Sequence, residues 1–90
     1  MFSVYVLQSE KTGKYYIGYT SNIQQRLSEH NAGKTKSTRP YRPWSLVYYR
    51  DSSSKRAARQ IELKIKKMKS RIFIDKLIAN QIDETFFNVN

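Results

Sequence analysis

The order of secondary-structure patterns predicts an α+β domain: a three-stranded antiparallel sheet flanked by helices, in the order β-β-α-β-α-α. Two observations carry this prediction. Three short runs are rich in β-branched and aromatic residues, and three segments repeat apolar residues at helical spacing. Short antiparallel strands with helices gathered on the sheet form an α+β fold. The 90 residues suffice for one domain, which we expect to span 1–80, with a tail over 81–90.

The first two strands are expected to form a hairpin. Phe2 to Ser9 has the sequence F-S-V-Y-V-L-Q-S, and Tyr15 to Thr20 has the sequence Y-Y-I-G-Y-T. Both are typical of strands, and the Thr12-Gly13 pair between them is a turn signal. Gly18 lies inside the second strand, where glycine costs stability unless something approaches the backbone closely.

The first helix is expected to begin at Ser21. Gln24 follows three residues later, and the two residues form a capping-box pattern. Ile23 and Leu27 supply the apolar stripe of this helix, and Gly33 is placed to end it.

The third strand and the last two helices follow a basic loop that contains two prolines. Trp44 to Arg50 (W-S-L-V-Y-Y-R) predicts the strand. The serines of 52–54 offer a cap for a helix whose apolar residues recur at helical spacing: Ala57, Ala58, Ile61, Ile65 and Met68. Ser70 is expected to cap the last helix, which packs through Phe73, Ile74, Leu77 and Ile78. The pattern predicts no element after Gln81.

The charge balance predicts a polyanionic partner. Seventeen Lys and Arg residues face seven Asp and Glu residues, giving a net charge of +10, and nucleic acid is the commonest polyanion. A merely soluble basic surface or attraction to an anionic membrane are the simpler alternatives. The cations are concentrated, however, since one stretch of 21 residues (52–72) contains a single acid and eight bases: Lys55, Arg56, Arg59, Lys64, Lys66, Lys67, Lys69 and Arg71.

Several classes of protein are excluded or disfavoured. The chain has no cysteine, so it can form no disulfide, zinc–thiolate site or cysteine nucleophile. The first ten residues lack a secretory signal pattern, and no apolar run approaches the roughly 20 residues of a membrane span. We therefore expect a cytoplasmic protein with no membrane partner.

Glu62 is the first candidate for a chemical role. A carboxylate among cations usually serves as a surface ion-pair partner. Ala58, Glu62 and Ile65 are spaced i, i+4 and i+7, however, which places Glu62 at the edge of the packed helix face. An ionised carboxylate there suits a divalent cation, because magnesium commonly takes only one or two protein carboxylates.

Arg26 and His30 share one face of the first predicted helix, at i and i+4. Arg26 could neutralise a phosphate oxygen with its planar guanidinium. His30 could form a hydrogen bond to a nucleophile or leaving group near neutral pH. For a lone histidine near a helix end, an exposed or capping role is the usual alternative.

Tyr5 and Tyr16 are expected to be cross-strand neighbours in the hairpin. Most strand tyrosines are simply packed, with the hydroxyl at the surface, and that alternative stays open for both residues.

Taken in order, these residues resemble the GIY-YIG endonucleases. The similarity rests on Val4-Tyr5-Val6, on the stretch from Tyr16-Ile17-Gly18 to Gly33 (Y-I-G-Y-T-S-N-I-Q-Q-R-L-S-E-H-N-A-G), on Arg42-Pro43, on Leu46 to Tyr49, and on the Ala-rich start of the Glu62 helix. It covers the chain from Val4 to about Ile78 and is greatest with the small stand-alone bacterial members, similar to excinuclease catalytic domains. The first motif is Val-Tyr-Val instead of Gly-Ile-Tyr, and Tyr19 stands where some repair enzymes have lysine.

The resemblance implies hydrolysis of a DNA phosphodiester bond by water, with one divalent ion, Mg²⁺ or Mn²⁺. It implies that Tyr16 is the general base, that Tyr5 supports it, that Arg26 stabilises phosphate charge and that His30 aids proton transfer. Glu62 would hold the metal. Gly18 would leave room for substrate, which would also contact Tyr19, Asn31, Lys66 and Lys67.

We therefore expect a metal-dependent DNA endonuclease, structure-directed, in DNA repair or recombination. A protein partner that supplies substrate recognition is compatible with this hypothesis. Two rivals remain: a catalytically silent DNA- or RNA-binding module of the same fold, and a basic protein of RNA or the ribosome. The last would present an exposed aromatic stacking platform, which Tyr48 and Tyr49 could form.

Overall fold

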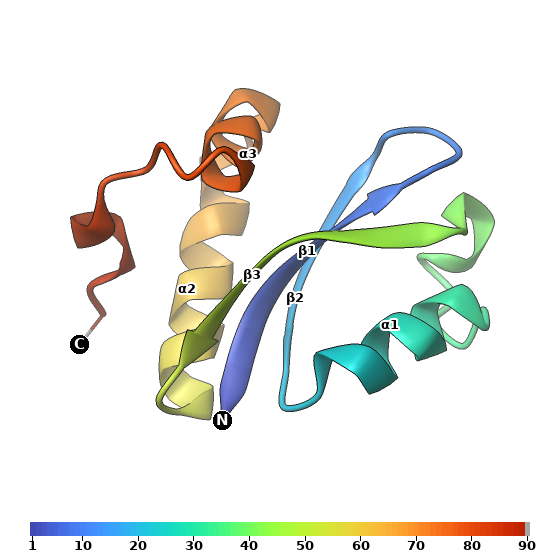
Figure 1. Ribbon diagram of the computed structural model, residues 1–90, viewed down its shortest axis with the longest axis horizontal. Helices are drawn as coiled ribbons and strands as arrows, with labels where there is room; N and C mark the ends of the chain where they lie inside the picture. Colours follow the sequence, from blue (N-terminus) through green and yellow to red (C-terminus); the bar gives the residue numbers. More distant parts are fainter. Residues whose placement is uncertain (90) are drawn as a thin grey trace.

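The computed structural model, described here for residues 1–89, confirms the predicted α+β fold and its element order (Figure 1). One three-stranded antiparallel sheet carries helices on both faces. The helices and strands are β1 (Phe2–Ser9), β2 (Tyr15–Thr20), α1 (Ile23–Asn31), β3 (Trp44–Ser52), α2 (Lys55–Met68) and α3 (Arg71–Ile78). Two 3-10 turns complete the fold, η1 (Arg39–Tyr41) and η2 (Glu84–Phe87).

The sheet has the order β2-β1-β3, so β1 is central and β2 is an edge strand. In the β1–β2 register, Tyr5 lies opposite Gly18, and Leu7 lies opposite Tyr16. Tyr5 and Tyr16 are therefore diagonal neighbours on one face of the sheet. Their ring centroids are 6.5 Å apart.

The side chains of the central strand β1 point alternately to the two faces of the sheet, and each face carries its own hydrophobic core. Val4 and Val6 point toward α2 and α3, where they are buried among apolar residues that include Ile61, Ile65 and Leu77. Tyr5 and Leu7 point to the other face, where they pack with Trp44, Tyr16, Leu27, Tyr41 and Leu46. Figure 1 shows α1 on that side of the sheet, and α2 with α3 on the opposite side. A site at the sheet edge can thus receive side chains from both layers.

The capping residues agree with the predictions at two helices and differ at one. Ser54 and Ser70 cap α2 and α3, each accepting a backbone N–H through its hydroxyl. The expected cap at Ser21 is wrong, because the Asn22 side chain caps α1 by accepting the Gln25 N–H at 3.1 Å. Asparagine and serine are about equally good N-cap residues, so the cap is decided by the backbone, which is extended at Asn22 and helical from Ile23.

The C-terminal segment packs onto the α2 and α3 side of the sheet. Phe87 of η2 is buried in that core, and the ring of Phe86 lies 4.9 Å from the ring of Phe73. Arg50 of β3 forms an ion pair with Glu84 at 2.7 Å. The sequence pattern predicted no element in this segment. Within residues 1–89, no helix combines the length and hydropathy needed to cross a membrane.

Candidate active site

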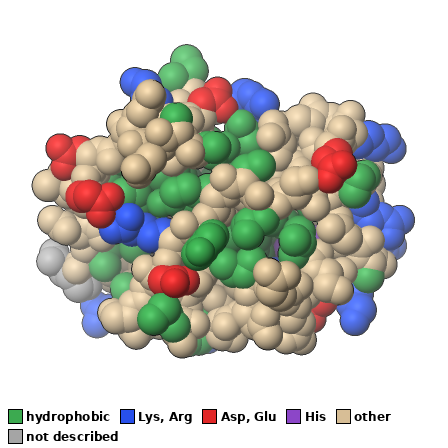
Figure 2. All heavy atoms as spheres, in the orientation of Figure 1, with side chains coloured by type: hydrophobic (Ala, Val, Ile, Leu, Met, Phe, Trp, Pro, Cys, Tyr) green, Lys and Arg blue, Asp and Glu red, His purple; other side chains and the backbone are tan. Residues whose placement is uncertain are grey.

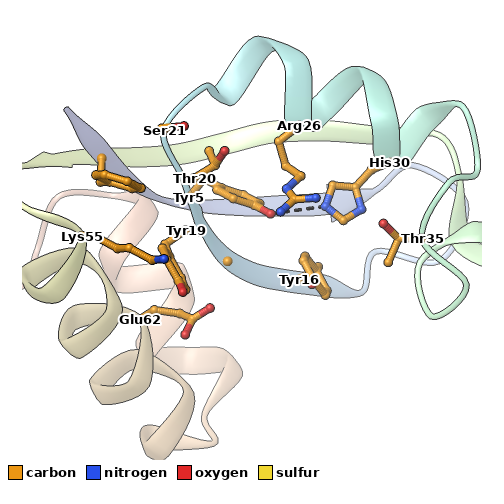
Figure 3. A pocket seen from close by; sticks show the side chains of 12 residues that line it. Tyr5, Tyr16, Tyr19, Thr20, Ser21, Arg26, His30, Thr35, Lys55 and Glu62 are labelled. Atoms are coloured by element: carbon orange, nitrogen blue, oxygen red, sulfur yellow. Dashed lines mark hydrogen bonds between the residues drawn. The ribbon is translucent and has the colours of Figure 1, made fainter.

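A pocket of about 540 Å³ opens along the edge strand β2 (Figure 3). Because β2 has a free edge, helices from both layers reach the pocket: α1 from one face and α2 from the other. Seven of the ten expected site residues line it, namely Tyr5, Tyr16, Gly18, Tyr19, Arg26, His30 and Glu62. Residues separated by up to 57 positions in the sequence (5 to 62) therefore share one cavity.

The α1 side of the pocket contains a chain of hydrogen bonds that is buried at His30. The Tyr5 hydroxyl lies 3.3 Å from Nε2 of His30, and Nδ1 of His30 lies 2.8 Å from the Thr38 hydroxyl. The Thr38 hydroxyl in turn donates to the Thr35 carbonyl at 3.3 Å. Tyr5, His30 and Thr38 are each no more than 3% exposed. The simpler alternative, an exposed or capping histidine, is therefore wrong for His30.

Burial determines the protonation states of Tyr5 and His30 at neutral pH. It raises the pKa of Tyr5, as do nearby Tyr16 and Glu62, while Arg26 acts in the opposite direction. Burial also lowers the pKa of His30, and Arg26 lowers it further against a smaller effect of Glu29. Both changes favour the uncharged forms, so Tyr5 keeps its proton and His30 is a neutral imidazole.

Tyr16 is held by aromatic neighbours at the boundary of the pocket. Its ring centroid lies 5.0 Å from that of His30 and 6.2 Å from that of Trp44, both in tilted or edge-on geometry. Tyr16 is less buried than Tyr5, and it projects from β2 into the pocket (Figure 3). Of the two tyrosines, Tyr16 is therefore more accessible to a water molecule in the pocket.

Gly18 makes room for Tyr5. A Cβ atom at Gly18 would lie 2.6 Å from Cζ and 3.0 Å from Cε2 of the Tyr5 ring, far inside van der Waals contact. The glycine inside β2 is thus explained by close packing of a side chain from the neighbouring strand. Gly18 also lines the pocket, so the room for substrate that the resemblance implies at this residue stays a prediction.

Arg26 projects from α1 toward the Tyr5 hydroxyl and the His30 ring (Figure 3). Its side chain is 43% exposed and forms one ion pair, with Glu29 at 3.2 Å. An exposed i, i+3 pair of this kind is weak. The guanidinium can therefore turn to an anionic group that enters the pocket.

Glu62 enters the pocket from α2, on the opposite side from Arg26 and His30 (Figure 3). It is only 4% exposed, as its position at the edge of the packed face predicted. Its two oxygens contact Arg59 at 2.8 Å and Lys66 at 3.4 Å, and both of these cationic side chains are about half exposed. The ion-pair role is therefore real, but its partners are free to move away.

The donor set around Glu62 fits a hard divalent cation of the magnesium type. Within residues 1–89, no three His, Cys, Asp or Glu side chains are grouped to hold a metal ion. One buried carboxylate that faces a polar pocket is nevertheless sufficient for magnesium, which keeps several waters and binds substrate phosphates.

Three expected site residues lie outside this pocket. The Asn31 side chain joins α1 to β3, accepting the Trp44 N–H at 2.6 Å and donating to the Trp44 carbonyl at 3.1 Å. Lys67 lies on the outer side of α2, beside Leu63 and Lys64. Lys66 contacts Glu62 and lines a neighbouring cleft.

That second cleft, of about 440 Å³, adjoins the pocket through Tyr16, which lines both. Four cationic side chains surround it: Lys14, Lys66, Lys69 and Arg71. We refer to it below as the basic cleft. On the face shown in Figure 2, by contrast, Lys and Arg side chains lie mainly around the periphery, separated by apolar and neutral atoms.

Several pocket residues were not predicted individually. Lys55 at the start of α2 carried a general signal as part of the basic run. Thr20, Ser21 and Thr35 also line the pocket, and no sequence pattern pointed to a role for them there. Thr38, which binds His30, lies in an irregular loop where periodicity gives no information.

This chain is similar in sequence and in fold to known proteins. UPF0213 proteins of Streptococcus pyogenes strains Manfredo and SSI-1 are each 47% identical to this chain over 70 residues, covering 76% of this chain and 74% of the relative. The solution NMR structure of a UPF0213 protein from Bacillus halodurans matches with a TM-score of 0.57 and 30% identity, covering 97% of this chain and 93% of that chain. Residues 1–75 match the family described as the GIY-YIG catalytic domain. With both tyrosine motifs, Arg26, His30 and Glu62 gathered around one pocket, this chain belongs to the GIY-YIG family.

Proposed function

We propose that the protein is a metal-dependent endonuclease that hydrolyses DNA phosphodiester bonds and acts on DNA structure in repair or recombination. The observation that supports this most is the pocket itself. β1, β2, α1 and α2 bring two tyrosines, an arginine, a histidine and a buried carboxylate to one cavity beside a cleft with four cations. This combination suits an anionic substrate and a reaction that requires proton transfer.

The substrate strand would follow the edge of β2. In this arrangement the scissile phosphate lies in the pocket between Arg26 and Glu62, and flanking phosphates contact the basic cleft. The net charge of +10 favours any nucleic acid, because phosphate contacts dominate affinity. Contacts of Lys and Arg to phosphates carry no direct sequence information, which supports recognition of DNA shape rather than of bases.

Each side chain has a distinct task in the proposed reaction. Tyr16 is the general base, since it is the more accessible tyrosine: its oxygen takes the proton of the attacking water as its own hydroxyl proton passes to solvent. Arg26 stabilises charge that develops on the phosphate oxygens, a contribution largest in a pocket shielded from water. Tyr5 keeps its proton and orients the polar groups around Tyr16, while neutral His30 can take up a proton.

A divalent ion held by Glu62 would supply Lewis-acid stabilisation of the phosphate and lower the pKa of bound water. The protein contributes the position of Glu62 on α2, across the pocket from Arg26. Positive groups on both sides of a phosphate address the main difficulty of phosphoryl transfer, which is the extra negative charge in the transition state.

The RNA-binding alternative receives less support from the structure. An aromatic platform for RNA needs neighbouring exposed rings on a sheet face. Tyr49 is 57% exposed, but Tyr48 is partly buried against the core on the other side of the sheet. The expected pair therefore does not form one platform.

The direct test is cleavage of nicked, branched, duplex and single-stranded DNA, beside RNA, in Mg²⁺, Mn²⁺ or EDTA. We expect metal-dependent cleavage of a branched or nicked DNA, and its loss in Tyr16→Phe with binding retained. Tyr49→Phe, which makes the same chemical change outside the pocket, is the matched control. Binding of DNA without cleavage of any substrate would favour the silent binding module, and preferential cleavage of RNA would overturn the DNA assignment.

A further inference from the structure

Thr38 closes the chain of hydrogen bonds behind His30, and its contacts leave it little freedom. Its side chain is 1% exposed. Its carbonyl accepts the indole N–H of Trp44 at 3.0 Å, and its own N–H donates to the Thr35 carbonyl at 3.2 Å. Because the backbone is fixed on both sides, the hydroxyl is presented to Nδ1 of His30 in one position.

The contacts of Thr38 favour one direction for each proton in the Tyr5–His30–Thr38 chain. The Thr38 hydroxyl has a single proton, and when it donates this proton to the Thr35 carbonyl, its oxygen accepts from Nδ1–H of His30. A neutral imidazole protonated on Nδ1 has a bare Nε2, and the Tyr5 hydroxyl donates to it. In the reverse arrangement the Tyr5 proton would have no acceptor among the hydrogen bonds of residues 1–89.

We propose that Thr38 is a positioning residue that holds His30 as the Nδ1–H tautomer, with Nε2 facing the Tyr5 hydroxyl. Its side chain lies behind the imidazole and has no place among the residues that line the pocket. Thr38 therefore acts through His30 rather than on the substrate.

The consequence for catalysis rests on the proposed nuclease function. When Nδ1 of His30 carries the proton, Nε2, which faces the Tyr5 hydroxyl, is the nitrogen able to accept another one. Its hydrogen bond also fixes the Tyr5 hydroxyl, whose lone pairs are then available to Tyr16, a water or the substrate. In the other tautomer, Nε2–H would point at Tyr5 and the acceptor nitrogen would be turned away from the site.

Nitrogen NMR of the histidine ring tests the tautomer without any substrate. His30 is the only histidine, so its ring signals need no assignment by mutation. Above neutral pH, we expect the wild-type protein to show Nδ1 protonated and Nε2 unprotonated. Thr38→Val keeps the shape and removes the acceptor, so the Nε2–H form should grow. Thr38→Ser should restore the wild-type signals, and Thr12→Val, at an exposed turn, should leave them unchanged.

Cleavage assays on the same proteins test the positioning role. In metal sites, where a partner fixes a histidine tautomer in the same way, loss of that partner costs about 10- to 100-fold in activity, and we expect a loss of this size in Thr38→Val. Thr38→Ser should recover most of the activity.

The outcomes separate this proposal from the proposed function. A wild-type Nε2–H tautomer, or ring signals that Thr38→Val leaves unchanged, overturns the proposal. Recovery of the tautomer without recovery of cleavage in Thr38→Ser removes the catalytic consequence. If no nucleic acid is cut while the ring signals change as expected, the nuclease assignment fails and the tautomer assignment stands.

Discussion

The ring of Tyr5 lies against the Cα of Gly18 on the neighbouring strand, in the space that any larger residue would occupy with its Cβ. The position of Tyr5 in the candidate site thus depends on the absence of a side chain at a residue paired with it. This dependence leads to the first prediction.

Gly18→Ala should displace the Tyr5 ring and weaken both stability and cleavage. The backbone of Gly18 has no positive φ, so alanine is strained only by the contact with Tyr5. Overpacking of this kind costs about 1–3 kcal/mol, measurable by chemical denaturation. In a Tyr5→Ala background the same substitution should be neutral or stabilising, because alanine is better than glycine in a strand. Equal destabilisation in both backgrounds would show that the contact is unimportant.

Glu62→Gln should abolish cleavage while DNA binding is kept or strengthened, because the change preserves shape and removes a negative charge from the pocket. Its partners Arg59 and Lys66 are about half exposed and stay hydrated without the carboxylate, so stability should change much less than cleavage. Glu84→Gln removes the same charge from an ion pair outside the pocket and is the matched control. Normal cutting by Glu62→Gln would exclude Glu62 as the metal ligand.

Arg26→Lys should reduce turnover much more than DNA affinity. Lysine keeps the charge but cannot reproduce the planar, two-pronged contact of a guanidinium with a phosphate. Arg56→Lys makes the same change at an exposed position of α2 that does not line the pocket. Turnover and affinity can be compared in single-turnover assays, and wild-type turnover in Arg26→Lys would remove Arg26 from the catalytic set.

Lys69→Glu should weaken DNA binding more than Lys67→Glu. Both residues lie at the exposed end of α2, but Lys69 lines the basic cleft and Lys67 lies on the outer side of the helix. DNA binding can be measured in EDTA over a range of salt concentrations. The slope of the logarithm of the binding constant against the logarithm of salt concentration should fall by about one unit for each phosphate contact removed. Equal effects of the two reversals would indicate general attraction by net charge.

The free energy of unfolding should fall as the pH drops below about 6.5, the usual pKa of histidine. Because burial lowers the pKa of His30, the unfolded chain binds more protons than the folded chain in this window. Thermal unfolding should show a smaller pH dependence in His30→Gln, which cannot take up the proton. Identical pH profiles for the two proteins would contradict the buried, neutral state of His30.

Local patterns in the sequence determined the order and type of the elements, because strand and helix periodicity and serine caps act within a few residues. They also placed Arg26 with His30 on one helix face and Glu62 at the edge of another, since helical spacing alone fixes these relations. The Ser21 cap was wrong because two adjacent residues were both able to cap α1, and only the actual backbone geometry selects Asn22.

Tertiary structure alone decided which of these side chains meet. The edge position of β2 lets α1 and α2, from opposite faces of the sheet, reach one pocket. Three contacts join different segments of the chain, and no periodic pattern in the sequence links those segments. They are the hydrogen bond of Thr38 to His30, the packing of Tyr5 on Gly18, and the hydrogen bonds of Asn31 to Trp44. Such contacts depend on how the helices pack on the sheet. Their burial and hydrogen bonds involve residues far apart in the chain, so they leave no local sequence pattern.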